Sequence, residues 1–245
     1  MSGSTRPFSS TVRPVRPARP VRTAAVAVLG VLTALVTATA CGGSSSSHTA
    51  AAATPPPAPV ASIDATPARL SVAQLPDSAV EGWKLLAPAR TQAVAGGIQL
   101  NECASVAGAT SWQQQAYISV YRTPAEQDVF TFHDAPAAKA AYQDLLARMG
   151  ACQSQSRALQ AKSHLADDAT VAATATTAQG TAWSRKWTGV EGISAAGPQT
   201  NHLYAVQQGA SLAIVHFDEW AGTQAAPYDT RADQDVLTAV AGQLG

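Results

Sequence analysis

Trp183, Arg185 and Trp187 have the residue types and the spacing of a ligand-binding surface. Side chains two residues apart share one face of a β-strand, so a strand here would place a guanidinium between two indoles. No acid partner for Arg185 is obvious from the sequence, and burying an unpaired charge is costly. The pattern therefore indicates a cleft, where Arg185 stacks on an indole and meets an anionic or carbohydrate-like ligand. The alternative is that one tryptophan packs in the core while the strand twists Arg185 into solvent.

A second polar group, His216, Asp218 and Glu219, ends a later apolar segment. His216 and Asp218 would share a strand face, which suits a weak metal site or an acid–base pair. Polar residues at a strand end more often contact solvent or cap the next turn. The sequence also contains no GxSxG, HExxH, GxGxxG or Walker motif. We therefore expect no catalytic residue, no metal ligand and no cofactor, and predict that the protein is not an enzyme.

The sequence contains three cysteines, Cys41, Cys103 and Cys152. Cys41 directly follows an apolar run and is assigned to lipid attachment below, which leaves an even pair. Because an exported protein folds in an oxidising compartment, we expect Cys103 and Cys152 to form a disulfide. A pair of metal ligands is the alternative, but the two residues are far apart and form no CxxC motif.

Residues 1–40 have the organisation of an export signal. Five arginines and no acid precede an uncharged apolar run from Thr23 to Ala40. The run leads through Ala38-Thr39-Ala40 into Cys41, which resembles the bacterial lipobox, whose cysteine becomes the diacylated first residue of the mature protein. We predict a lipoprotein signal peptide over residues 1–40 and a palmitate-type lipid anchor on Cys41. The alternatives are cleavage after Ala40 by the ordinary signal peptidase, or an uncleaved anchor.

Residues 41–65 are rich in Gly, Ser, Ala and Pro and form a predicted disordered tether. Such a tether would hold a folded domain on the outer, extracytoplasmic face of the cell membrane. The whole chain has 16 basic and 16 acidic residues, so nothing in its charge favours a nucleic-acid partner. Scarce lysine and abundant alanine suggest a GC-rich genome, such as that of an actinobacterium.

Residues 66–245 are predicted to form one folded domain. Two segments have the period of an amphipathic helix, one from an Asp134 cap to Gly150 and one starting near Asp229 or Thr230. Gln208-Gly209-Ala210 predicts a hairpin turn between the last two strands. The order of strand, strand, helix, four strands and helix predicts an α+β domain. The expected strands cover residues 117–122, 129–133, 169–177, 182–188, 202–207 and 211–217.

Several features together carry a family resemblance: the apolar LSVAQLP at Leu70–Pro76, then Trp83, then Cys103 before the first strands, a helix ending at Cys152, and a late hairpin before a C-terminal helix. This arrangement resembles the PknH-like extracellular sensor domain, a family that includes the outer domain of a mycobacterial serine/threonine kinase and many actinobacterial lipoproteins. The resemblance implies a single antiparallel β-sheet with two amphipathic helices packed on one face, and a cleft for an unknown ligand. This chain departs from the kinase in having one disulfide where that sensor domain has two. It also has no kinase domain, so a signalling role would need a partner.

The late hairpin has two largely apolar faces. With its tip at Gly209 and Ala210, one face carries His202, Tyr204, Val206, Ala213, Val215 and Phe217. The other face carries Leu203, Ala205, Leu212, Ile214 and His216. If helices cover only one side of the sheet, the second side must line a cavity or dock a partner protein.

These observations favour a membrane-tethered extracellular lipoprotein with a noncatalytic ligand-binding or sensing domain. Its predicted partners are the membrane, through the lipid anchor on Cys41, and an unknown small or cell-wall-derived ligand or an envelope protein. One alternative is a scaffold lipoprotein that binds envelope proteins through the second sheet face. The other is a cell-envelope hydrolase that uses carboxylates such as Asp218 and Glu219.

Overall fold

The computed structural model of the 245-residue chain describes residues 69–220, 222 and 227–245. The predicted signal peptide, the lipid anchor on Cys41 and the tether at residues 41–65 lie outside these residues and stay predictions. Within the described ranges, no helix has both the length and the apolar character needed to span a bilayer.

The described residues are organised around an eight-stranded sheet in which neighbouring strands pair antiparallel. Seven strands follow the order β1-β5-β6-β10-β9-β8-β7, and β2 also pairs with β5, while β3 and β4 form a separate two-stranded sheet. The α+β class is therefore confirmed, but the single sheet implied by the resemblance is wrong. The strands are β1 Lys84–Leu85, β2 Arg90–Ala93, β3 Ile98–Gln99, β4 Ser105–Val106, β5 Ser111–Ile118, β6 Pro124–Thr131, β7 Thr170–Thr176, β8 Gly180–Gly189, β9 Gly197–Gln208 and β10 Ser211–Trp220.

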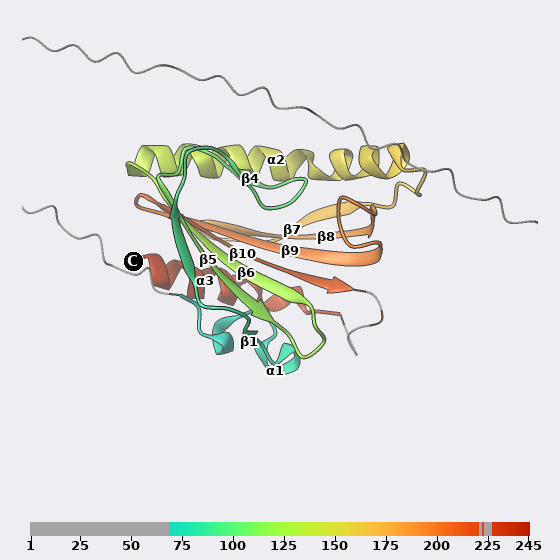
Figure 1. Ribbon diagram of the computed structural model, residues 1–245, viewed down its shortest axis with the longest axis horizontal. Helices are drawn as coiled ribbons and strands as arrows, with labels where there is room; N and C mark the ends of the chain where they lie inside the picture. Colours follow the sequence, from blue (N-terminus) through green and yellow to red (C-terminus); the bar gives the residue numbers. More distant parts are fainter. Residues whose placement is uncertain (1–68, 221, 223–226) are drawn as a thin grey trace, which may run out of the picture. The chain divides into compact units, whose positions relative to one another are not determined.

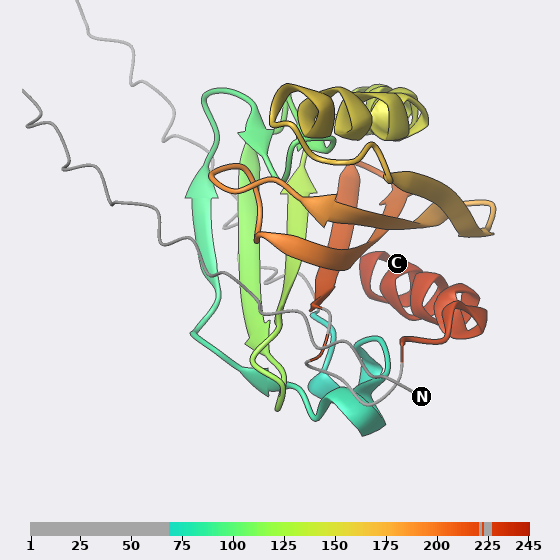
Figure 2. The same ribbon diagram turned by 90° about the vertical axis from the view of Figure 1, so that its right-hand side faces the viewer.

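The two long helices cover opposite faces of the large sheet (Figures 1 and 2). Leu145 of α2 packs in one apolar cluster with Leu203 of β9, whereas Leu237 of α3 packs in another with the adjacent Tyr204. Neighbouring residues of a strand point to opposite faces, so the expectation of both helices on one face is wrong. The helical segments are η1 Val72–Gln74, α1 Ser78–Glu81, α2 Ala135–Lys162, η2 Thr230–Ala232 and α3 Asp233–Leu244.

Helix α2 starts where the sequence predicts and runs farther. The Asp134 side chain accepts a hydrogen bond from the Ala137 backbone N–H at 2.8 Å, as an N-cap does. Gly150 does not end the helix, which continues to Lys162. Glycine in a helix interior costs about 1 kcal/mol, and the buried packing of Cys152 and of later residues on the same helix outweighs this cost.

The β9–β10 hairpin has the predicted register. Val206 lies opposite Ala213 and Tyr204 opposite Val215, and Gly209 at the tip has a φ of 55°, in the left-handed region that favours glycine. Its two apolar faces are explained by the helices on both sides. Helix α3 therefore covers the second face, so the uncovered apolar face expected from the sequence is absent from this hairpin.

The two edges of the large sheet are irregular. At one edge β5 is covered by two short strands, β1 and β2. At the other edge, β7 pairs with β8 through a register shift between Ala173 and Ala175. An extra residue of this kind bends a strand and increases its twist.

Candidate functional site

A polar cavity of about 200 Å³ lies on the α2 side of the sheet. Toward the hairpin tip, this side of β9 and β10 carries buried aliphatic residues such as Ala205 and Ile214. At the ends of β9 and β10 away from the hairpin tip, the residues that face α2 are polar. The polar residues at the cavity wall include Glu102, Arg185, Asn201, His216 and Asp218.

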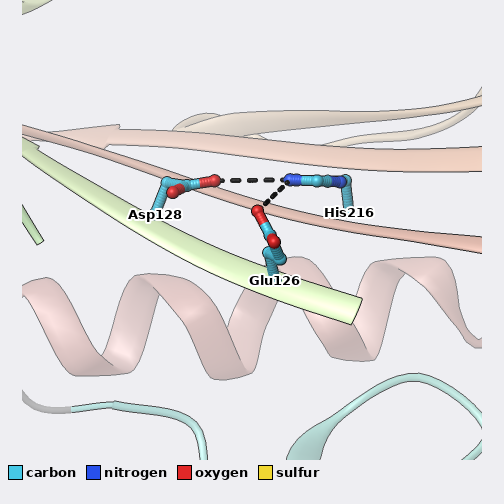
Figure 3. Close-up of side chains that lie close together, drawn as sticks. All are labelled: Glu126, Asp128 and His216. Atoms are coloured by element: carbon cyan, nitrogen blue, oxygen red, sulfur yellow. Dashed lines mark ion pairs between the residues drawn. The ribbon is translucent and has the colours of Figure 1, made fainter. Parts of the chain in front are cut away.

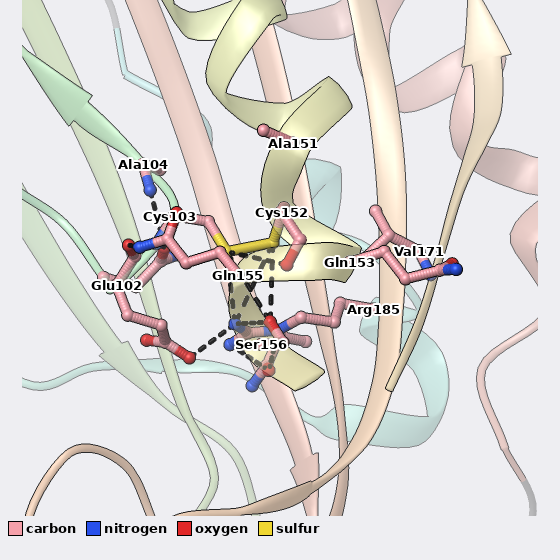
Figure 4. The surroundings of a disulfide bond; sticks show 12 residues. Glu102, Cys103, Ala104, Ala151, Cys152, Gln153, Gln155, Ser156, Val171 and Arg185 are labelled. Carbon is pink, nitrogen blue, oxygen red and sulfur yellow. Dashed lines mark hydrogen bonds and ion pairs between the residues drawn. A yellow bond between two sulfur atoms is a disulfide. The ribbon is translucent and has the colours of Figure 1, made fainter. Parts of the chain in front are cut away.

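Arg185 is buried and bound on several sides (Figure 4). Its guanidinium forms an ion pair with Glu102 and donates to Asn201 Oδ1 from Nε at 3.0 Å and from Nη2 at 2.7 Å. It also donates to Ser156 Oγ at 3.2 Å and lies 4.1 Å from the centre of the Trp187 ring. Burial lowers the pKa of Arg185, and the charge of Glu102 opposes this shift. The premise that a buried Arg185 would have no acid partner is therefore wrong.

The structure contains the predicted disulfide between Cys103 and Cys152. The bond joins the segment before β4 to the middle of α2, and the Cys103 Sγ lies 3.5 Å from the Arg185 guanidinium. Because Glu102 precedes Cys103, the disulfide holds the carboxylate beside its arginine. Cross-linking residues 49 apart stabilises the fold by about 4 kcal/mol in loop-closure entropy.

Asn201 connects the Arg185 ion pair to the far wall of the cavity. Its Oδ1 also accepts from Trp187 Nε1 at 2.8 Å, and its Nδ2 donates to Asp218 Oδ1 at 2.5 Å. Burial raises the pKa of Asp218, while the hydrogen bond from Asn201 acts in the opposite direction. The cavity wall is therefore a continuous network from Glu102 to Asp218.

His216 contributes an imidazole to the same cavity. Burial alone lowers its pKa, but the interactions with Asp128 and Glu126 outweigh burial and raise the pKa to about 10. The contact with His216 lowers the pKa of Glu126. As predicted, His216 and Asp218 share one strand face.

A larger cleft of about 600 Å³ opens on the opposite, α3 side of the sheet, beside the segment that leads into η2. Ser184 and Lys186 of β8 and Thr200 of β9 supply polar groups. Trp187, Trp220 and Tyr228 supply aromatic surface. This volume is within the usual range for small-molecule sites, whereas the cavity on the α2 side is below it.

His202 is fixed at the wall of this cleft. Its Nε2 lies 2.8 Å from Glu219 Oε2, and its ring stacks on Phe217 with centroids 4.5 Å apart. Glu219 Oε1 in turn accepts from the Tyr228 backbone N–H at 2.7 Å. Asp218 bonds to Asn201 on the α2 side while Glu219 bonds to His202 on the α3 side. The two carboxylates therefore face opposite sides of the sheet and do not form the acid–base pair that a hydrolase would need.

The structure keeps Arg185 in contact with Trp187, but the three residues predicted to line one cleft border two different cavities. Trp183 and Arg185 line the small cavity, and Trp187 lines the large cleft. All three side chains are buried. Their role in ligand binding stays a prediction.

Sequence reasoning missed several charged residues on the α2 side of the sheet. Glu102 lies 83 positions before Arg185, and no periodic pattern connects the two. Glu126 and Asp128 precede the expected strand start at residue 129, although β6 begins at Pro124. The two-residue spacing of Glu126 and Asp128 could have revealed the pair, because it places both carboxylates on one face of a strand.

No protein-family model matches the sequence, and neither does any curated protein. Among solved structures, the chain is similar to the extracellular domain of PknH from Mycobacterium tuberculosis, with 12% identity and a TM-score of 0.39. The match covers 65% of this chain and 85% of that chain. We base no argument on a likeness this weak, so membership of the PknH-like family stays a prediction.

Proposed function

We propose that the protein is a noncatalytic binding protein, displayed on the outer face of the cell membrane by a lipid on Cys41, that takes a small cell-wall-derived ligand. The observation that carries this proposal is the cleft of about 600 Å³ on the α3 side of the sheet. Its lining combines hydroxyl groups, aromatic side chains and one lysine with Asp168, His202 and Glu219, a combination suited to a polar ligand such as a sugar with an acidic substituent on the lysine.

Lys186 is the charged group that the cleft leaves available to a ligand, because Glu219 pairs with His202 and Asp168 accepts a hydrogen bond from Thr188. Its side chain is exposed and forms no ion pair with any residue in the described ranges. Ser184 on the same strand face and Thr200 on the neighbouring strand add hydroxyl groups on the same side. An anionic group on the ligand would therefore meet a cation flanked by hydrogen-bond partners.

Two features support display outside the cell. The Cys103–Cys152 disulfide fits an oxidising compartment. The apolar segment ending at Cys41 and the tether at residues 41–65 fit a lipid-anchored position above the membrane.

The other two functions have less support. The scaffold function relied on an uncovered apolar sheet face, and α3 covers that face. The hydrolase function relied on Asp218 and Glu219, which point to opposite sides of the sheet.

The proposal is tested by native mass spectrometry of the full chain from its own host, followed by titration with soluble peptidoglycan fragments. We expect a bound fragment, and Lys186→Ala to weaken its binding roughly tenfold or more through loss of a charge-assisted contact. Lys139→Ala, at an exposed position on α2, is the matched control and should bind like the wild type. Absence of fragment binding, or equal affinity for the two variants, would overturn the proposal.

A further inference from the structure

Glu126, Asp128 and His216 bring three metal-binding atoms together on the α2 side of the sheet (Figure 3). Glu126 of β6 lies directly opposite His216 of β10, and Asp128 is two residues further along β6 on the same face. Both carboxylates point at the His216 Nε2, from Glu126 Oε2 at 3.5 Å and from Asp128 Oδ2 at 3.4 Å. Antiparallel pairing of two strands therefore builds the group.

These distances suit ligands around a shared metal ion better than a direct hydrogen bond. An N–H···O bond usually spans 2.7–3.2 Å between heavy atoms. A tetrahedral Zn²⁺ with ligand bonds of about 2.1 Å separates its ligand atoms by about 3.4 Å. All three ligand atoms lie within 4.8 Å of one another, and Glu126 is partly exposed, so its side chain has room to adjust to an ion.

Two atoms in the group have no hydrogen-bond partner, although both are buried. Asp128 is fully buried, and its Oδ2 accepts no hydrogen bond within the described part of the chain; the same holds for His216 Nε2. Leaving such groups unsatisfied costs free energy. The two atoms instead form an ion pair with each other at 3.4 Å, and a divalent ion that displaces the imidazole proton could bind both.

The remaining carboxylate contacts orient the group. Trp112 Nε1 donates to Asp128 Oδ1 at 2.7 Å, and Gln114 Nε2 donates to Glu126 Oε2 at 3.0 Å. Metal-binding carboxylates are commonly held by hydrogen bonds of this kind. The charges also favour a cation, because one imidazole supplies at most one positive charge against two carboxylates, whereas a divalent ion supplies two.

We propose that Glu126, Asp128 and His216 bind a divalent transition-metal ion, with Zn²⁺ as the best fit. An imidazole nitrogen with two carboxylate oxygens suits Zn²⁺, whereas Mg²⁺ and Ca²⁺ prefer oxygen ligands alone. Glu126 is one-third exposed and His216 about one-fifth, which leaves a path for the ion.

The test uses the tag-free full chain, stripped with a chelator and titrated with Zn²⁺ by calorimetry, with Mg²⁺ as the comparison ion. We expect one Zn²⁺ per chain and no comparable Mg²⁺ binding. His216→Gln and Asp128→Asn should each weaken Zn²⁺ binding at least tenfold, whereas His133→Gln, at an exposed histidine, should leave it unchanged.

Trp112→Phe tests the positioning contact, because it keeps an aromatic ring and removes the donor to Asp128. We expect Zn²⁺ affinity to fall about 10- to 100-fold. Circular dichroism of each metal-free variant shows whether it is folded. If Asp128→Asn does not fold, Glu126→Gln, at the most exposed ligand, provides a second measurement of Zn²⁺ affinity. Stoichiometric Zn²⁺ binding that survives in both His216→Gln and Glu126→Gln, or no Zn²⁺ binding by the wild type, would overturn the proposal.

Discussion

The two sides of the large sheet are built from the same strands but are stabilised differently. The α2 side holds the Arg185–Glu102 ion pair and the cluster of His216 with two carboxylates, under a helix joined by a disulfide. The α3 side is an aromatic core in which buried tyrosine hydroxyls bond to neighbours, Tyr117 to the Leu70 carbonyl at 2.9 Å. Both sides therefore bury paired polar groups, since the α3 side holds the His202–Glu219 pair and the buried Asp233. The two sides differ in that only the α2 side has a covalent link, whereas the α3 side adds extensive aromatic packing.

This difference shows that the two faces of one sheet can be stabilised by different interactions. Burial of charge requires close partners in fixed places, so the α2 side must be rigid to remain stable. On the α3 side, the apolar core packs against α3. The cleft lies outside this core, beside the segment that leads into η2.

Breaking the buried ion pair should have the largest effect. Arg185→Met leaves Glu102 buried beside an apolar side chain, and we expect a loss of about 3–5 kcal/mol in the free energy of unfolding. Urea denaturation measures this loss. The double variant Arg185→Met/Glu102→Leu removes both charges and should recover most of the stability.

The exposed Lys84→Met is the control and should change the free energy of unfolding by less than about 0.5 kcal/mol. A loss at Arg185 as small as at Lys84 would show that the α2 side does not depend on this pair. Such a result would favour the sequence prediction that Arg185 lies in a cleft open to solvent.

Reducing the disulfide should give the next largest effect. Reduction is expected to lower the free energy of unfolding by about 4 kcal/mol, measured by urea denaturation with and without reductant. Because the bond holds Glu102 near Arg185, the coupling energy of that pair in a double-mutant cycle should also fall. An unchanged coupling energy would mean that the rest of the cavity positions Glu102.

The α3 side should be sensitive to alkali through Tyr117. Burial raises the pKa of Tyr117 to about 12, so the unfolded chain ionises first as the pH rises. The stabilising contribution is complete below pH 10 and is lost between pH 10 and about 12, and it amounts to about 3 kcal/mol. Tyr117→Phe should therefore lose stability less steeply over this range; parallel pH curves for the two proteins would contradict the assignment.

The sequence predicted the elements from β6 to α3 because their signals are local, but it did not predict the short strands β1 to β4. Alternation located the strands from β6 to β10, Gly209 located the hairpin, and Asp134 located the start of α2. The first long strand was displaced: residues 117–122 were expected, but β5 ends at Ile118 and a turn follows, in which Arg122 has a φ of 66°.

The placement of the helices and of the charges was not predictable in the same way. An apolar stripe shows that a helix must be covered but not which face of a sheet covers it. The two apolar faces of the β9–β10 hairpin were the available signal for helices on both sides. Likewise, Glu102 is brought to Arg185 by the fold and by the adjacent disulfide. The sequence around Arg185 therefore could not reveal its partner.

The irregular edges of the sheet affect whether copies of the domain can pair through their edge strands. A long, straight edge strand offers unpaired backbone groups to a second copy and invites aggregation. Here one edge is divided between the short strands β1 and β2, and the other is bent by the irregularity between Ala173 and Ala175. Neither edge is a regular template, so strand-to-strand polymerisation of copies is disfavoured at both edges.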